Sequence, residues 1–203
     1  MAEKPLMLRL PTGRRLAARR LETRSSHPPI VESTGTLATS FERVAAWLQP
    51  ESIHLGVPLR DSLHALEFIA GVIATQHDLD QALVVRALSR REELGSTGLG
   101  GGFAVPHAGI VGIDRPLTLL VRARDPIAFK APDHKPVSLM LAILVPEHCD
   151  RNDHLKLLAL VVELFSDPRF RARIDTDVAP ANVAAAVAEG IARLRATAST
   201  VST

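Results

Sequence analysis

Apolar residues recur every three or four positions in four segments of the chain, which is the spacing of an amphipathic helix. Aspartate or asparagine stands in front of the first three segments, and such residues cap helices by accepting a hydrogen bond from a backbone amide. The pattern therefore predicts four helices: one after Asp61, one from Asp78 or Asp80 to near Gly95, one capped by Asn152 or Asp153, and one over about residues 180–195.

Four shorter apolar runs lie between these helices and predict β-strands over residues 51–57, 103–105, 117–121 and 137–145. The last two runs are almost continuously hydrophobic, as expected for strands that are covered on both faces. Helices and strands that interleave in this way are typical of an α/β sandwich.

Both ends of the chain lack such a pattern. Prolines and small polar residues interrupt residues 1–40, and residues 197–203 are small and polar. We therefore expect a basic, poorly ordered N-terminal extension over residues 1–40, a single domain over residues 41–196, and a poorly ordered tail over residues 197–203.

Composition narrows the class of protein. Hydrophobic residues make up 46% of the 203-residue chain and charged residues 23%, a balance typical of a globular domain. The single cysteine, Cys149, cannot form an internal disulfide, and no apolar run reaches the roughly 18 residues needed to cross a bilayer. These features exclude a disulfide-stapled secreted domain and a membrane span, and they favour a reducing cytoplasm.

Basic residues are concentrated near the N-terminus. Residues 1–24 hold seven of them against two acidic residues, whereas the whole chain carries a net charge of only +2. Such an arm can contact nucleic acid or anionic lipid, but this one holds no aromatic side chain on which a base would stack. We expect a solvated extension with no nucleic-acid partner; salt-dependent binding that is lost on deleting residues 1–40 would contradict this.

The most informative stretch runs from Arg91 to His107 and holds five glycines within residues 95–102. Successive backbone amides in such a loop can bind an anion, although the spacing matches neither a P-loop nor a dinucleotide-binding fingerprint. Because Pro106 has no amide to donate, a sheet ladder is expected to stop there. His107 is then expected at the carboxyl end of a strand, where open α/β sheets bind their ligands.

A second histidine, His154, follows the predicted strand 137–145 at the start of a helix, where backbone amides attract a phosphoryl group. A neutral imidazole is a competent nucleophile toward phosphorus near pH 7. Spacing alone leaves two possibilities open: two histidines that face each other, or one functional histidine, His107, beside a bystander.

Residues 95–107, GSTGLGGGFAVPH, resemble the phosphorylation-site motif of the fructose/mannitol class (type 2) of IIA domains in the bacterial phosphoenolpyruvate-dependent phosphotransferase system (PTS). Nitrogen-regulatory IIA proteins are the members that the motif resembles most. The similarity continues through short matches up to His154-Leu155 and covers about residues 43–195. It implies a mixed central β-sheet of about five strands, flanked by helices on both faces.

Residue by residue, the resemblance implies that His107 is the phosphorylated nucleophile, that His154 assists the transfer, and that Arg91 balances the phosphoryl charge. It implies a phosphate-binding loop made by Ser96, Thr97 and Gly98. It implies no metal and no cofactor.

One position departs from the pattern of the family. Ala108 and Gly109 follow His107, where many members have glycine and then a basic residue. The sequence therefore predicts that the basic residue which many members carry just after the histidine is missing here, which leaves Arg91 as the predicted cation of the site.

The resemblance implies a phosphohistidine carrier that receives a phosphoryl group on His107 from a small phosphocarrier protein, HPr or its nitrogen-branch relative. The output stays open between a regulator, whose phosphorylation state changes binding to partners such as a potassium transporter or a sensor kinase, and a sugar-specific component that passes phosphate to a IIB domain. The lack of a fused permease or carrier domain favours the regulator. A non-catalytic module that binds an anion or nucleotide in the glycine loop is the remaining alternative.

Overall fold

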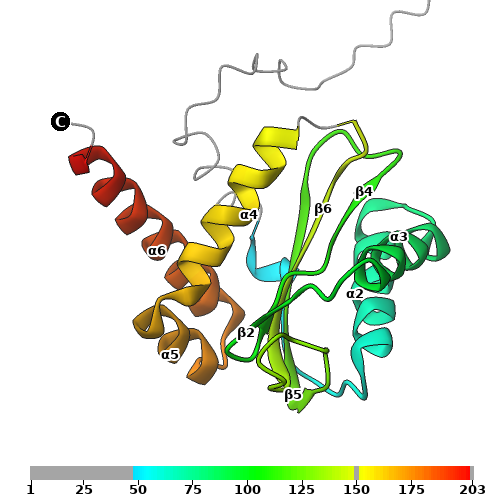
Figure 1. The fold of residues 1–203 in the computed structure, drawn as a ribbon, viewed down its shortest axis with the longest axis horizontal. Coiled ribbons are helices and arrows are strands. Elements are labelled where there is room, and N and C mark those ends of the chain that lie inside the picture. The colour runs from blue at the N-terminus through cyan, green and yellow to red at the C-terminus, as the bar shows by residue number, and fades with distance from the viewer. Residues whose placement is uncertain (1–47, 149–150, 202–203) are drawn as a thin grey trace, which may run out of the picture. The chain divides into compact units, whose positions relative to one another are not determined.

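A mixed six-stranded sheet forms the centre of the computed structural model, which describes residues 48–148 and 151–201 (Figure 1). The basic extension expected over residues 1–40 lies outside the described residues, as does Cys149. The strands are β1 (Ile53–Val57), β2 (Gly98–Gly100), β3 (Phe103–Ala104), β4 (His107–Ile110), β5 (Leu117–Ile127) and β6 (Val137–Pro146). The helices are the 3₁₀ turn η1 (Pro50–Ser52), α2 (Ser62–His77), α3 (Gln81–Glu93), α4 (Arg151–Ser166), α5 (Pro168–Thr176) and α6 (Pro180–Val201).

The strand order is β1-β5-β6-β3-β2, and β4 also pairs with β6. Strand β5 runs antiparallel to β6 and parallel to β1, whereas β3 and β4 both run parallel to β6. In Figure 1, α2 and α3 lie on one side of the sheet and α4, α5 and α6 on the other. The expectation of a mixed sheet with helices on both faces is therefore confirmed, with six strands instead of about five.

Two hydrophobic layers hold the helices to the sheet. Alternate residues of a strand point to opposite faces, so Leu119 and Met140 pack on the side of α2 and α3, while Leu120 and Leu141 pack on the side of α4, α5 and α6. All four side chains are buried. Burial of each such side chain contributes about 1.5–3 kcal/mol, which explains why β5 and β6 read as nearly continuous apolar runs.

The first two helices begin where their caps predict. An Asp61 carboxylate oxygen accepts a hydrogen bond from the backbone amide of His64 at 2.8 Å, and Asp80 accepts one from the amide of Ala82 at 2.8 Å. Each aspartate satisfies a donor that the first turn of a helix leaves without an intrahelical partner. Because α3 ends at Glu93, just before the glycine-rich loop, its last turn lies next to that loop.

The ends of α4 and α6 correct two expectations. Helix α4 begins at Arg151, so Asn152 and Asp153 lie in its first turn and do not cap it. Helix α6 continues to Val201, and the tail expected over residues 197–203 therefore starts as helix. No glycine or proline follows Gly190, and alanine is the strongest helix former, so nothing in the sequence stops α6 near residue 195.

Helix α5 was not predicted. It begins at Pro168 behind the Asp167 cap, whose carboxylate accepts a hydrogen bond from the amide of Arg169 at 2.9 Å. A residue of the sheet fixes the end of this helix, because Nη1 of Arg122 on β5 donates a hydrogen bond to the carbonyl of Ile174 at 2.7 Å. A nine-residue helix that buries only Phe170 and Ile174 leaves too short a periodic signal to recognise in sequence.

Helix α6 approaches α4 closely at Gly190. A Cβ there would lie 2.5 Å from Cδ1 of Leu164, whereas a Cβ on Gly71 in α2 would meet only the flexible end of Gln81, at 3.3 Å. Both glycines lie inside helices, so alanine gains about 1 kcal/mol of helix propensity at either position, while overpacking costs about 1–3 kcal/mol at Gly190 alone. We expect Gly190→Ala to unfold at lower urea concentration than Gly71→Ala. Equal midpoints would show that this contact does not constrain the packing of α4 on α6.

Candidate functional site

His107 lies at an interruption in a strand. Strands β3 and β4 run along the same partner, β6, and are separated by Val105 and Pro106. Proline removes one donor, but the Pro106 carbonyl still accepts a hydrogen bond from the amide of Ile143 at 2.9 Å, so pairing resumes at once. His107 is therefore the first residue of β4, and the expectation that it ends a strand was wrong.

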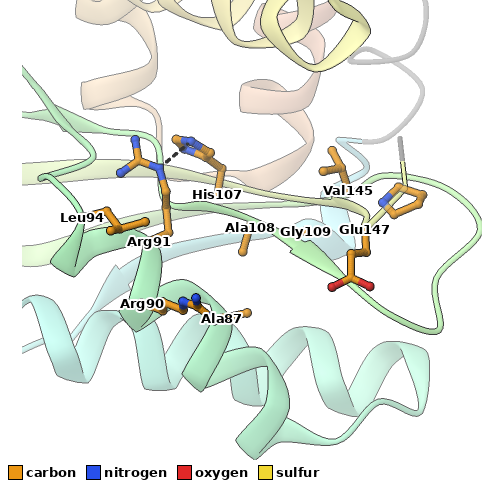
Figure 2. Close-up of a pocket in the computed structure, with 10 residues that line it drawn as sticks. Ala87, Arg90, Arg91, Leu94, His107, Ala108, Gly109, Val145 and Glu147 are labelled. Atoms are coloured by element: carbon orange, nitrogen blue, oxygen red, sulfur yellow. Dashed lines mark hydrogen bonds between the residues drawn. The ribbon is translucent and has the colours of Figure 1, made fainter. Parts of the chain in front are cut away.

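The His107 ring is half-buried and is held at both nitrogens. Its Nδ1 lies 2.8 Å from the carbonyl oxygen of Val105, and its Nε2 lies 2.9 Å from Nε of Arg91 (Figure 2). A guanidinium only donates, so Nε2 accepts; a carbonyl only accepts, so Nδ1 carries the proton and donates. This assignment places the lone pair of the neutral imidazole on Nε2, on the side of Arg91.

Arg91 extends from the last turn of α3 and contacts two parts of the site. Its Nε donates to His107, and its Nη1 donates to the carbonyl oxygen of Gly95 at 2.7 Å. His107 and Arg91 are 16 residues apart in the chain, and the packing of α3 beside β4 brings them together. The guanidinium is thus fixed to the glycine-rich loop through Nη1 and directed at the histidine through Nε.

The hydroxyl groups of the loop are engaged by the protein itself. Thr97 is only 3% exposed, and both its amide (2.9 Å) and its hydroxyl (2.6 Å) donate to Oε2 of Glu92. The Ser96 hydroxyl donates to the carbonyl oxygen of Phe129 at 2.6 Å. Each hydroxyl has a single proton to donate, so in this structure neither one is directed at an anion next to His107.

Gly98 allows the loop to approach its neighbour. A Cβ at this position would lie 2.9 Å from the Cβ of Ala131, a separation that real side chains do not reach. The next turn is held by Asp133, whose carboxylate accepts hydrogen bonds from the amides of Gly101 (2.8 Å) and Lys135 (3.1 Å). These bonds, first of all that from Gly101, hold the pKa of Asp133 below its usual value. The loop is therefore shaped by internal contacts.

His154 lies in the first turn of α4, which follows β6 in the chain. Its side chain is outside the described part of the structure, so the structure does not test whether it faces His107. Its role remains a prediction.

A pocket of about 560 Å³ lies beside His107, between α3 and the end of the sheet (Figure 2). Its walls combine Arg90, Arg91 and Leu94 with β4 and with Glu147, which follows β6. Sequence analysis identified Arg91 and His107 but not Arg90, Glu147 or the Thr97 acceptor Glu92. No motif carries them, because their positions depend on how α3 packs against β4.

Two further properties bear on the chemistry of the site. Within residues 48–148 and 151–201, no group of three or more histidine, cysteine, aspartate or glutamate side chains is placed to hold a metal ion. In the same ranges, every helix is too short or too polar to cross a bilayer.

An α/β domain that presents an imidazole lone pair beside a guanidinium at the rim of a pocket is equipped for phosphoryl transfer through histidine. Residues 46–189 match the model of the family described as phosphoenolpyruvate-dependent sugar phosphotransferase system, EIIA 2, and the chain belongs to this family. The resemblance inferred from residues 95–107 is thereby confirmed. Family membership supports a phosphocarrier role, a transferase-type activity that proceeds through a histidine.

Individual relatives are similar over most of the same region. A nitrogen regulatory protein of Klebsiella oxytoca is 36% identical over 121 residues, which cover 59% of this chain and 74% of that protein. A PTS system fructose-specific EIIA component of Haloferax volcanii is 33% identical over 110 residues, which cover 54% of this chain and 71% of that protein. The crystal structure of nitrogen regulatory protein IIA-Ntr from Neisseria meningitidis has a TM-score of 0.67 and 32% identity, and the match covers 71% of this chain and 98% of that chain.

Proposed function

We propose that this protein is a phosphohistidine carrier and regulator that accepts a phosphoryl group on Nε2 of His107 from a small HPr-like or nitrogen-branch phosphocarrier. One observation carries the proposal: Nδ1 is bonded to the Val105 carbonyl, which leaves the nucleophilic lone pair on Nε2, next to the Arg91 guanidinium. Nitrogen regulatory relatives and the family match support it. The single cysteine favours the cytoplasm as its compartment.

The transfer exchanges one phosphorus–nitrogen bond for another. The Nε2 lone pair forms the new bond to phosphorus, and the electron pair of the breaking bond returns to the imidazole nitrogen of the carrier. The proton on Nδ1 stays in place, and the Val105 carbonyl stabilises the positive charge that the His107 ring gains. Donor and acceptor are both imidazoles, so the step is reversible, and positioning and charge stabilisation supply the catalysis.

Arg91 is the residue best placed to meet the phosphoryl charge. Once Nε2 bonds phosphorus, it no longer accepts the proton of Arg91 Nε, and this donor becomes available to a phosphoryl oxygen. The second bond, from Nη1 to Gly95, keeps the guanidinium near the site. Since the protons of Ser96 and Thr97 are already donated to protein acceptors, we assign these residues and Gly98 to holding the loop that positions Arg91.

We propose that His154 assists from the first turn of α4 by donating a hydrogen bond to a phosphoryl oxygen. His154→Ala is then expected to slow the transfer while His107 can still be modified, because the nucleophile is intact. The measurement is the rate of phosphorylation by the phosphorylated carrier, followed by rapid quenching. A rate equal to that of the unmodified protein would remove His154 from the site.

The regulator is favoured as the output, because phosphorylation adds about −1.5 to −2 charges at one surface position and can make or break a contact. Candidate targets are a potassium transporter or a sensor kinase. The second candidate is a sugar-specific component that passes phosphate to a IIB domain. The observation that supports it is the similarity to the fructose-specific relative. Incubation of the phosphorylated protein with a IIB domain separates the two, since only the second predicts transfer of the label.

The test of the proposed function is to incubate the full chain with phosphoenolpyruvate, the first enzyme of the system and the phosphocarrier, and to map the modified residue by mass spectrometry. We expect acid-labile, alkali-stable phosphate on His107 and none in His107→Gln. His148→Gln is the matched control, because the His148 side chain lies near the pocket and is 95% exposed. Label that survives in His107→Gln contradicts the proposal, and tight nucleotide binding without label favours the non-catalytic binding module.

A further inference from the structure

A second pocket lies away from His107, where the start of β5 meets the end of α2. It has a volume of about 370 Å³ and is lined by the η1 turn, by the last residues of α2 and by residues 115–118. The side-chain amide of Gln76 on α2 donates to the backbone carbonyl of Glu51 at 3.1 Å, which fixes η1 beside the helix. A cavity of this size is typical of a small-molecule site.

This pocket shares no residue with the one beside His107. Thr118 pairs with Ile143 on β6, and Ile143 pairs on its other side with His107. Neighbouring strands are about 4.8 Å apart, so about 10 Å of sheet separate the backbones of Thr118 and His107. A ligand in this pocket therefore does not occupy the place of the phosphoryl group, although it lies close to His107.

One positive and one negative side chain line the pocket without pairing to each other. Arg115 and Glu51 are both exposed, and in residues 48–148 and 151–201 neither side chain makes a hydrogen bond or an ion pair. Opposite charges that are held apart in one pocket match a ligand that itself carries both charges. A guanidinium binds a carboxylate through two parallel hydrogen bonds, and a carboxylate accepts hydrogen bonds from an ammonium group.

The remaining polar groups of the pocket wall are uncharged. Thr118 is only 6% exposed, and its hydroxyl is buried without a hydrogen-bond partner among the described residues. Native proteins rarely leave such a group unpaired unless a ligand or a bound water completes it. Partial burial, and then the positive charge of Arg115, hold the pKa of His77 below its usual value, so this imidazole is neutral near pH 7. Together with Ser52, these groups can bond a polar ligand side chain but do not favour a charged one.

We propose that this pocket binds a free α-amino acid with a polar, uncharged side chain, with its carboxylate on Arg115 and its ammonium group on Glu51. The inference goes beyond the proposed function, since it needs no phosphoryl transfer. A simple anion is repelled by Glu51, and a simple cation is repelled by Arg115 in the same way. A zwitterion is the charge pattern that satisfies both residues at once.

The test is isothermal titration calorimetry of the full, unphosphorylated chain with the common L-amino acids. We expect at least one amino acid with a hydroxyl or amide side chain to bind at millimolar concentration or below. The N-acetyl and C-amide derivatives of the same amino acid should bind about tenfold more weakly or less, because each derivative removes one of the two charges. Acetate and inorganic phosphate are the probes for a simple anion site. Equal affinity for either of them, or no binding by any amino acid, would overturn the proposal.

Variants locate the ligand in the pocket. Arg115→Gln and Glu51→Gln should each weaken binding about tenfold or more, and the nearly isosteric Thr118→Val about fivefold. Arg124→Gln and Glu163→Gln are the matched controls, since both residues are exposed and lie outside the pocket, and they should keep the affinity of the unmodified protein. Charge variants that bind like these controls would contradict the proposal. Because every measurement uses unphosphorylated protein, such a failure leaves the proposed function intact, and a failure of phosphoryl transfer leaves the amino-acid site intact.

Discussion

Replacing Arg91 with alanine is expected to slow phosphoryl transfer to His107 about 100-fold, the usual effect of removing one aligned donor from a developing negative charge. Arg91 is the residue that contacts both His107 and the glycine-rich loop, at 2.9 Å and 2.7 Å. The variant loses the donor that becomes available when Nε2 bonds phosphorus. The measurement is the single-turnover rate with saturating phosphorylated carrier.

Arg91→Lys sharpens this prediction. Lysine keeps the positive charge but has no planar guanidinium that can donate to the Gly95 carbonyl and to the site at the same time. We therefore expect a rate between those of the alanine variant and the unmodified protein. If Arg91→Ala transfers phosphate at the unmodified rate, the guanidinium does not stabilise the transfer, and the charge must be met by other groups.

Replacing Glu92 with alanine is expected to destabilise the fold by about 2 kcal/mol or more, because it leaves two donors of one buried residue without an acceptor. Those donors are the amide and the hydroxyl of Thr97. The Thr97 carbonyl accepts a hydrogen bond from the amide of Val105 at 2.9 Å, and the Val105 carbonyl holds Nδ1 of His107. Transfer to His107 is therefore expected to slow as well. Urea unfolding and the transfer rate measure the two effects.

The neighbouring Glu93 provides the control for this variant. It is exposed and lies on the same last turn of α3, but within the described residues its side chain makes no hydrogen bond or ion pair. Glu93→Ala should keep the unfolding midpoint within about 0.5 kcal/mol of the unmodified protein. If Glu92→Ala and Glu93→Ala behave alike, the Glu92–Thr97 contact does not hold the loop.

Local signals explain which parts of the fold could be predicted. Asp61 and Asp80 cap α2 and α3 through bonds to amides two or three residues away, so both helix starts are readable in sequence. Strand β4 was missed because it is only four residues long and follows a proline. Its existence depends on pairing with β6, whose partner residues lie 36 positions further along the chain, as in the pair His107 and Ile143.

The residues in the sequence motif of the site were also predictable from sequence, whereas the contacts that they make were not. His107 and Arg91 were identified through the resemblance of residues 95–107 and the residues before them, while the bond between them depends on how α3 packs against β4. The hydroxyls of Ser96 and Thr97 were expected next to the phosphoryl group, as loop hydroxyls often are. Their acceptors, the carbonyl of Phe129 and the carboxylate of Glu92, could not be read from spacing, because only the folded loop brings them into reach.

The central claim is that Nε2 of His107 is the nitrogen that accepts the phosphoryl group. Proton–nitrogen correlation NMR of the ring nitrogens, on protein labelled with ¹⁵N histidine before and after phosphorylation by the carrier, tests it most directly. We predict that His107 starts as the Nδ1–H tautomer and that phosphorus couples to Nε2 afterwards. Phosphorus coupled to Nδ1 of His107, or to a nitrogen of another histidine, would contradict the account.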